Sequence, residues 1–436
     1  MAGNKRDELL DLDIADLSHD GRGVARRDGK AVFVTGALPG ERVRAKLVRK
    51  HRQFDEAAVV EVRTASPDRV EPRCPHFGVC GGCVLQHLAP AAQIAAKQHT
   101  LLENLARIGQ VEPARILEPL AGDPWGYRRR GRLSVKDVRK KERVLVGFRE
   151  LDGRYVADLC ECHVLDPAVG MRIPALAALI ETLDARADVP QIEIAIGDRV
   201  AALVVRHLQA LTDADVAKLV AFGEREGLAM LGQSGGPDTV RPLAGDTVEL
   251  SFALPHHGIE LVFEPLDFVQ VNATMNERMI EHALALLEPG PGRRVLDLFC
   301  GLGNFTLPIA RRGAETVGVE GDAGLIARAR LNAQRNGLAV EYHAADLFQD
   351  QRDAPWARAP YDALLVDPPR AGAAEVLAYL PRRGTDRVVY VSCHPGSLAR
   401  DAGILVREHG FTLAAAGVMD MFPHTAHVES IALFER

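Results

Sequence analysis

The second half of the sequence constrains the fold most, because from about residue 266 it alternates helical segments with short apolar runs. The apolar runs lie at residues 294–299, 316–320, 340–343, 363–367, 388–392 and 430–434. Runs of this length and composition are typical of strands buried on both faces. With the intervening helices they predict an α/β fold with a doubly wound, Rossmann-like sheet, whose ligand sites lie at the carboxyl ends of the strands.

The first 62 residues carry a different pattern, in which short strands are separated by turn signals. The expected strands are residues 12–17, 31–34, 41–47 and 57–62. Asp-Gly or Pro-Gly dipeptides lie between them, at residues 20–21, 28–29 and 39–40. Several alternating strands in so short a segment predict a small closed barrel, and OB-like barrels commonly bind oligonucleotides.

The length of 436 residues is too great for one ordinary core and predicts two to three domains. We expect an OB-like barrel at residues 1–62, a mixed α+β central domain at 63–265, and the α/β domain at 266–436. Residues 86–110 have helical periodicity. This helix lies in the central segment, but it is a candidate to pack on the α/β domain.

The charge is spread unevenly along the chain. The net charge is −6, yet residues 1–150 hold 28 Lys and Arg against 20 Asp and Glu, a balance of +8. Basic runs at residues 42–52 and 128–132 favour contact with phosphates. No apolar run approaches the roughly 18 residues of a membrane span, and the N-terminus lacks a signal-peptide pattern. We therefore expect a cytoplasmic protein with reduced cysteines.

A glycine-containing loop follows the first strand of the α/β domain, in Asp297-Leu-Phe-Cys-Gly-Leu-Gly-Asn304. The next strand ends in Glu320, where an acidic residue would hold ribose hydroxyls, and Asp346 after the third strand suits an adenine amino group. The loop lacks the third glycine of a dinucleotide fingerprint and the Gly-Lys-Ser/Thr of a P-loop. These features predict S-adenosylmethionine as cofactor, because it carries no phosphates.

The motif after the fourth strand narrows the reaction. It reads Asp367-Pro-Pro-Arg370, whereas many methyltransferases that act on exocyclic amines have an aromatic residue after the two prolines. The arginine favours methylation of carbon.

A cysteine and a glutamate near the C-terminus fit carbon methylation of a uracil. Cys393 follows an apolar run, and Glu429 precedes the last one. Position C5 of uracil becomes nucleophilic only after a thiolate adds to C6, and a base must then remove the C5 proton. Each residue alone is more often structural, since free cysteines are commonly buried and glutamates commonly exposed. Their combination with a methyl-donor site favours catalysis.

Three closely spaced cysteines, Cys74, Cys80 and Cys83, indicate a metal site in a cytoplasmic chain. Cys160 or Cys162 is available as the fourth ligand. The spacing does not distinguish zinc from an iron–sulfur cluster, since both accept four thiolates. The spacing differs from that of radical enzymes, so we expect a closed structural site.

Together these motifs resemble the bacterial RNA uracil-C5 methyltransferases, over nearly the whole chain. The resemblance implies that the barrel is a TRAM domain and that the cysteines hold a [4Fe-4S] cluster. It selects Cys162, in Glu161-Cys162-His163, as the fourth ligand beside Cys74, Cys80 and Cys83.

The resemblance also implies roles for residues of the α/β domain. Cys393 would be the nucleophile and Glu429 the proton acceptor. The implied S-adenosylmethionine contacts are Gln270, Phe299, Asn304, Glu320, Asp346 and Asp367. One position departs from the family, which usually has asparagine where this chain has His394. Two roles are open to this histidine: lowering the pKa of the thiol, or packing.

The presence of both barrel and cysteine loop favours the 23S rRNA branch of the family, giving 5-methyluridine in that RNA. We expect no membrane association, no obligate protein partner and a monomer. The alternatives are a tRNA or another rRNA site, cytosine-C5 methylation with Cys300 as a second thiol, and a non-catalytic RNA-binding or redox protein.

Overall fold

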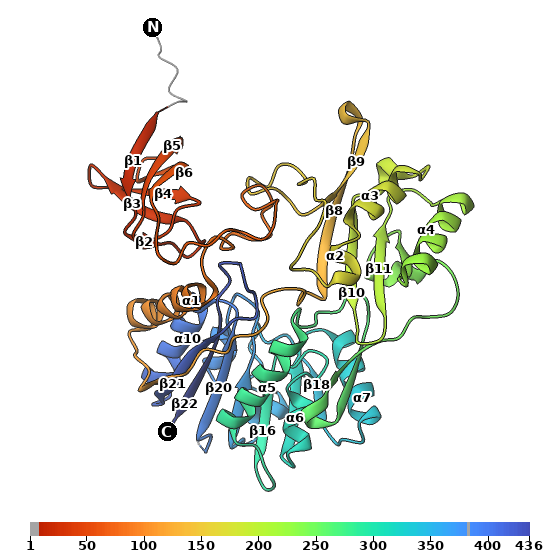
Figure 1. The fold of residues 1–436 in the computed structure, drawn as a ribbon. Helices are drawn as coiled ribbons and strands as arrows, with labels where there is room; N and C mark the ends of the chain where they lie inside the picture. Colours follow the sequence, from red (N-terminus) through yellow and green to blue (C-terminus); the bar gives the residue numbers. More distant parts are fainter. Residues whose placement is uncertain (1–7, 382–383) are drawn as a thin grey trace.

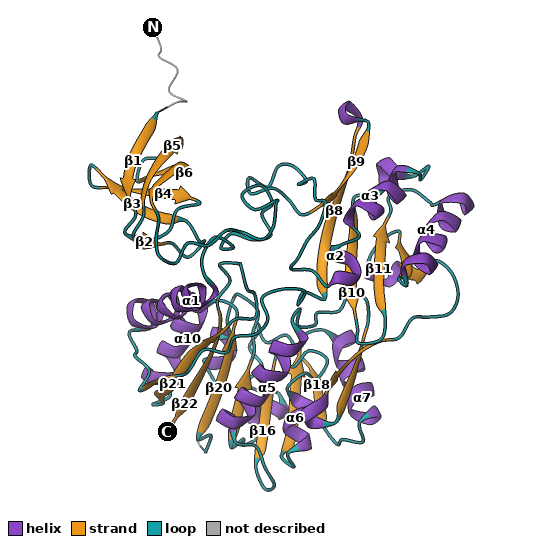
Figure 2. Ribbon diagram, in the orientation of Figure 1, coloured by secondary structure: helices purple, strands orange, loops and turns teal. Residues whose placement is uncertain are grey.

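The computed structural model describes residues 8–381 and 384–436. Figure 1 shows three bodies: a small β-barrel at upper left, a central α+β body at upper right, and a larger α/β body below both. Figure 2 shows that loops occupy the space where the three meet. The predicted fold class, a doubly wound α/β domain with a barrel and a mixed domain, is confirmed.

The barrel is one curled sheet with strand order β1-β5-β6-β4-β3-β2. Its strands are β1 (Leu9–Asp13), β2 (Asp16–Leu17), β3 (Gly23–Arg27), β4 (Lys30–Thr35), β5 (Arg42–Lys50) and β6 (Phe54–Thr64). Alternate residues point into the barrel core, among them Leu12, Val34 and Val43. The sequence reading missed β3, because Gly23-Val-Ala-Arg-Arg has few of the residues that favour strands.

The central body is a six-stranded sheet of order β13-β12-β11-β10-β8-β9, covered by helices. The strands are β8 (Arg130–Val138), β9 (Arg143–Gly147), β10 (Gln191–Ile196), β11 (Ala201–Arg206), β12 (Ala229–Gln233) and β13 (Val240–Pro242). The helices are α2 (Pro167–Gly170), α3 (Ile173–Glu181) and α4 (Asp213–Glu226). Apolar residues of α3 and α4 pack on β10 and β11 to form its core.

The α/β body is built on a sheet of order β18-β17-β16-β19-β20-β22-β21-β7. The strands are β7 (Arg115–Ile116), β16 (Arg294–Leu298), β17 (Glu315–Glu320), β18 (Glu341–Ala344), β19 (Ala363–Val366), β20 (Arg387–Ser392), β21 (Thr412–Met419) and β22 (Glu429–Glu435). Strand β22 is antiparallel to both neighbours, and the other pairings are parallel. Successive strands step away from β16 in one direction and then in the other, so the switch point lies between β16 and β19.

Helices cover both faces of this sheet. One face carries α5 (Ala273–Leu287), α6 (Thr306–Arg311) and α7 (Ala323–Arg335). The other carries α1 (Pro90–Asn104), α8 (Pro355–Arg358), α9 (Ala374–Leu377) and α10 (Pro395–Arg407). Alternate residues of each strand belong to the two cores, so that Val389 faces α5 and Tyr390 faces α10. The strands are therefore buried on both sides, as their apolar runs predicted.

Helix α1 comes from the N-terminal half of the chain but packs on α10 and β21 of the α/β body. A π-helical turn, Leu105–Gly109, extends it along α10. The buried residues of α1 are Gln93, Lys97 and Leu101. Two of the three are polar, which apolar periodicity could not have revealed.

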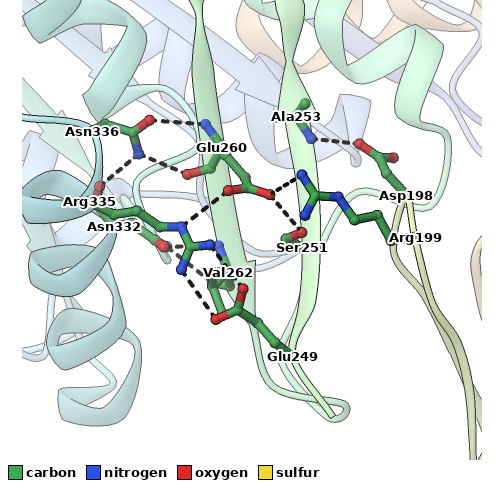
Figure 3. A network of polar contacts seen from close by, with 10 residues as sticks. All are labelled: Asp198, Arg199, Glu249, Ser251, Ala253, Glu260, Val262, Asn332, Arg335 and Asn336. Carbon is green, nitrogen blue, oxygen red and sulfur yellow. Dashed lines mark hydrogen bonds and ion pairs between the residues drawn. The ribbon is translucent and has the colours of Figure 1, made fainter.

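A hairpin, β14 (Leu250–Leu254) and β15 (Ile259–Phe263), joins the central body to α7 (Figure 3). The side-chain amides of Asn332 on α7 and of Asn336, its C-cap residue, each bond to both the N–H and C=O of one β15 residue, Val262 and Glu260 respectively, at 2.8 to 3.1 Å. These amides take the place of a neighbouring strand. On the far side, the Asp198 carboxylate accepts the Ala253 N–H at 2.8 Å.

Candidate active site

The loop after β16 is shaped by unusual backbone angles. Phe299, Gly301 and Gly303 all have positive φ, of 64°, 54° and 99°. A Cβ atom added to Gly301 would meet nothing within 4 Å, whereas one added to Gly303 would stand 3.0 Å from the Tyr342 hydroxyl. Gly303 therefore allows tight packing of the loop, and Gly301 leaves its backbone open to a ligand.

Acidic residues lie at the carboxyl ends of three strands on the two sides of β16. Glu320 ends β17, and its Oε2 accepts the Gly301 N–H at 3.2 Å. Asp346 follows β18 and is exposed, with its Oδ1 accepting the Phe348 N–H at 3.0 Å. Asp367 follows β19, and burial raises its pKa to about 7. Carboxylates in this number disfavour a phosphate ligand and suit ribose hydroxyls and a positively charged sulfonium.

The remaining predicted cofactor contacts border the same loop. The Asn304 amide exchanges two hydrogen bonds with Asn276 on α5, at 2.8 and 2.9 Å. Gln270 is half-buried in the segment that leads into α5. The Phe299 ring lies 5.8 Å from that of Phe348. Sequence reasoning missed Phe348, although its position two residues after Asp346 was an available signal.

Asp297 was not predicted as a site residue, yet it is fully buried on β16 beneath the loop. Its Oδ2 accepts a hydrogen bond from the Thr306 hydroxyl at 2.5 Å, while Oδ1 has no hydrogen-bond partner among the residues that the structure describes. Burial, together with the Asp367 and Glu320 carboxylates, raises the pKa of Asp297 to about 8, although the Thr306 hydrogen bond acts in the opposite direction.

Cys393 and Glu429 lie at the ends of two paired strands. Cys393 directly follows β20, and Glu429 is the first residue of β22. Ser392 pairs with Ser430 across these strands, so the thiol and the carboxyl stand beside the same cross-strand pair. Cys393 is half-buried, whereas Glu429 is 4% exposed. The fold thus brings together two residues that are 36 positions apart in sequence.

The charges around this pair oppose ionisation. Burial raises the pKa of Cys393 to about 11, with further contributions from the Glu429 and Asp367 carboxylates. The Arg370 guanidinium acts in the opposite direction. Burial also raises the pKa of Glu429 well above its ordinary value, and Asp367 adds to that rise. A carboxylate with a raised pKa is a stronger base once it is ionised.

His394 has a local structural role. It is the N-cap residue of α10, and its Nδ1 accepts the backbone N–H of Ser397 at 3.1 Å. An asparagine side chain can make the same bond. This geometry favours a structural role for His394 at the start of the helix.

A cavity of about 830 Å³ extends from Cys393 to the cysteine loop. It is lined by parts that are far apart in sequence: His19 from the barrel, Asn104 from α1, Arg128 from the central body, and His427 beside Arg370. A volume of this size accommodates a nucleotide. Three bodies therefore enclose the space around the Cys393 thiol.

Four cysteines line the far end of the same cavity: Cys74, Cys80, Cys83 and Cys162. Burial raises the pKa of Cys80 to about 11 and that of Cys83 to about 12, and the neighbouring thiols add to both. Cys160 instead lines a separate hollow, with its Sγ 3.0 Å from His76 Nε2.

The kind of metal group that these thiols could hold depends on how far apart they stand. Among residues 8–381 and 384–436, no three His, Cys, Asp or Glu side chains are close enough together to hold one ion. An iron–sulfur cluster spreads its ligands over several iron atoms, so its thiolates stand further apart than those around zinc. The donor set is all thiol, which suits zinc as well as a cluster, and a cationic centre would favour the thiolate forms.

The basic run at residues 128–132 is mostly engaged within the protein. Arg129 pairs with Asp198, Arg132 pairs with Glu193, and Arg130 donates to the Pro265 carbonyl. Arg128 lines the cavity. The run at residues 42–52 differs, since most of its basic residues are exposed on the barrel.

Two family models match the sequence. One is described as tRNA (Uracil-5-)-methyltransferase and matches residues 243–436, and the other is the TRAM domain, at residues 6–60. Proteins named 23S rRNA (uracil(1939)-C(5))-methyltransferase RlmD, from Stenotrophomonas maltophilia and Xanthomonas euvesicatoria, are each 62% identical to this chain. Each match covers 97% of this chain and 96% of the relative.

Among solved structures, the fold is similar to that of a Pyrococcus abyssi tRNA (uracil-54, C5)-methyltransferase, solved with S-adenosyl-L-homocysteine. The TM-score is 0.75 at 22% identity, and the match covers 98% of this chain and 100% of the other. In the described part of this chain, no helix is long and apolar enough to cross a membrane.

Proposed function

Because the chain belongs to the bacterial RNA uracil-C5 methyltransferases, we propose that it methylates uracil 1939 of 23S rRNA, as its 62% identical relatives are named to do. The membership makes it an S-adenosylmethionine-dependent enzyme. The observation that carries the proposal is the position of Cys393 and Glu429 beside the Ser392–Ser430 pair at adjoining ends of β20 and β22, with Cys393 lining a nucleotide-sized cavity.

In the proposed reaction the target uridine leaves its stack and enters the cavity, as base-modifying enzymes require. The Cys393 thiolate bonds to C6, and the electron pair displaced from the C5–C6 bond is delocalised onto the C4 carbonyl. S-Adenosylmethionine, when bound, supplies an electrophilic methyl group to C5. The Glu429 carboxylate then takes the C5 proton, the C5–C6 double bond re-forms, and Cys393 leaves as thiolate.

The charges at the site suit this order of events. Arg370 favours the thiolate of Cys393, against the burial that raises its pKa. Burial makes the Glu429 carboxylate a strong base, and Asp367 strengthens it further. The C5 proton is acidified by the adjacent carbonyl, so general-base assistance worth about 10²–10⁴-fold suffices.

The proposed cofactor contacts are Gln270, Phe299, Asn304, Glu320, Asp346 and Asp367. Their support is the convergence of strand ends on the open backbone of Gly301. The proposed cluster ligands are Cys74, Cys80, Cys83 and Cys162, supported by their common cavity and their all-thiol donor set. A [4Fe-4S] centre there would play a structural role.

The decisive experiment supplies labelled S-adenosylmethionine together with separate unmodified 23S rRNA and tRNA transcripts, followed by nucleoside analysis. We expect 5-methyluridine in the rRNA alone, at position 1939. Label in tRNA would keep the chemistry and reject the substrate, and 5-methylcytidine would reject both. No label in either RNA would favour a non-catalytic RNA-binding protein.

Two substitutions test the proposed roles. Cys393→Ala removes the nucleophile and should abolish methyl transfer. Glu429→Gln leaves addition possible but removes the base, so a covalent protein–RNA adduct should accumulate and resist denaturing electrophoresis. Methylation by Cys393→Ala would overturn the mechanism.

A further inference from the structure

Two buried polar residues of α1 hold the loop that joins β21 to β22. The Lys97 Nζ donates to the Asp420 carboxylate at 2.7 Å and to the Phe422 carbonyl at 2.9 Å. One turn earlier, the Gln93 Oε1 accepts the His424 N–H at 2.8 Å. Gln93 is 1% exposed and Lys97 is 3% exposed. Both are therefore inside the protein, on one face of a helix that lies outside residues 243–436.

The held loop leads directly to the proposed base. Met419 pairs with Glu429 across β21 and β22, so residues 420–428 form a loop closed by that pair. Asp420, the residue that Lys97 holds, is the immediate neighbour of Met419. A displacement of Asp420 would therefore be transmitted to Glu429 through Met419, which adjoins Asp420 in sequence and pairs with Glu429 across the strands.

The same loop is also held from other directions, at His424. The His424 carbonyl accepts the N–H groups of Val84 and Leu85, both at 3.0 Å, from the segment after the cysteine loop. The His424 ring lies 4.0 Å from that of Trp125. The backbone of His424 has a positive φ of 68°, a conformation that a residue other than glycine keeps only when its surroundings impose it. Gln93 is one of the contacts that impose it.

Packing alone does not account for these polar groups. Burial lowers the pKa of Lys97, and the Asp420 carboxylate opposes that change. A buried ion pair is often no more stabilising than apolar residues of similar volume. Lys97 and Gln93 instead fix the position of the loop, because each bonds to a specific backbone group of it. Apolar side chains could not make such bonds.

We propose that Gln93 and Lys97 are positioning residues that set the place of the Glu429 carboxylate for removal of the C5 proton. The inference rests on the proposed function, in which Glu429 is the base. The step they support is the last one, in which the C5–H bond breaks, the proton passes to Glu429, the C5–C6 double bond forms, and the C6–S bond to Cys393 breaks. Addition and methyl transfer precede this step and do not need Glu429.

The test uses Lys97→Met and Gln93→Leu proteins. It measures two stages separately: addition with methyl transfer, and removal of the C5 proton with release of Cys393. RNA that carries 5-fluorouridine at the target has no C5 proton to lose, so its covalent adduct forms by addition and methyl transfer and then persists. We expect adduct formation on this RNA within about twofold of wild type. On ordinary RNA we expect turnover to fall about 10- to 100-fold, as displaced catalytic groups typically cause, with transient accumulation of the covalent adduct.

Controls address folding and specificity. His99→Ala changes an exposed residue of the same helix and should behave as wild type. If Lys97→Met fails to fold because Asp420 is left buried and unpaired, Lys97→Met combined with Asp420→Leu removes both charges and should show the same separation of stages. Equal slowing of both stages, or unchanged turnover, would overturn the inference. Failure of wild type and Glu429→Gln to form any adduct would instead reject the proposed function.

Discussion

At the scale of single residues, the site is dominated by carboxyl groups that burial holds in an unusual state. Asp297, Asp367 and Glu429 all have raised pKa values; Asp367 contributes to the raised pKa of the other two and of Cys393, and Glu429 contributes to that of Cys393. A protein concentrates such groups where charge is needed during a reaction, since each is costly to stability. A bound sulfonium would favour their ionised forms.

The pH dependence of the reaction follows from Cys393 and Glu429. In the proposed reaction both must be ionised to act, and burial raises both pKa values, that of Cys393 to about 11. We therefore expect kcat/KM to rise from pH 7 to pH 9, by up to about tenfold per pH unit while the thiol is mostly protonated. Single-turnover rates across this range test it. A flat or falling profile would contradict the raised pKa of the thiol.

Asp297 should make stability depend on pH in a specific direction. Its pKa is raised to about 8 in the folded protein, so the folded state keeps a proton that the unfolded chain releases near pH 4. The stabilising contribution is full below about pH 4 and is lost as pH rises through 8. We expect Asp297→Asn to weaken this loss, which can reach about 1.4 kcal/mol per pH unit. Urea denaturation at pH 6 and 8.5 measures it, and an unchanged difference would contradict the assignment.

At the scale of elements, the ends of strands and helices carry the site. The N-cap of α10 fixes the residue next to Cys393, because His394 Nδ1 accepts a hydrogen bond from the first turn of that helix. The amide ladder of Asn332 and Asn336 similarly fixes β15 against α7 (Figure 3). Asn332 also donates to the Leu302 carbonyl at 3.2 Å, so this ladder reaches the cofactor loop.

The N-cap of α10 can be tested by two substitutions of His394. His394→Asn retains an acceptor for the Ser397 N–H and should preserve stability, whereas His394→Ala should lower the free energy of unfolding by about 1 kcal/mol. Chemical denaturation gives both values. The pH–rate profile should be the same in His394→Asn as in wild type. A displaced profile would show that the histidine acts on the thiol instead.

Predictions of elements from sequence succeeded where apolar composition was decisive. The six apolar runs of the α/β body all became strands. Strand β21 was missed because Thr412-Leu-Ala-Ala-Ala-Gly is rich in alanine and poor in residues that favour strands. It forms a strand because it lies between β22 and β7, which is a tertiary circumstance.

At the scale of the whole molecule, the excess of positive charge lies in the N-terminal part of the chain, and several bodies together line the cavity. The first 150 residues carry the positive balance of +8, and the exposed basic residues of β5 lie on the barrel. The cavity beside Cys393 is lined by residues of the barrel, the cysteine loop and the central body. RNA held by the barrel would therefore be close to the reacting thiol.

The barrel's contribution should appear in the salt dependence of RNA binding. Arg49 and Arg52 are exposed at one end of the basic run. We plot the logarithm of the RNA association constant against the logarithm of the salt concentration. If each arginine contacts a phosphate, the double substitution to alanine should make the slope of this plot shallower by about 0.7 to 0.9 per contact. Arg225→Ala, an exposed arginine on α4, is the matched control. Equal slopes in all three proteins would exclude these phosphate contacts, and S-adenosylmethionine affinity should not change.

The sequence by itself determined the fold class, the family and the type of reaction, because these depend on local pattern. Apolar runs of strand length, a glycine loop and a cysteine near an apolar strand are each readable within a few residues. The tertiary structure alone decided that Cys393 and Glu429 adjoin, that Cys162 rather than Cys160 shares a cavity with the other thiols, and that Gln93 and Lys97 face inward. Those facts depend on contacts between distant segments, and a buried polar residue looks in sequence like an exposed one.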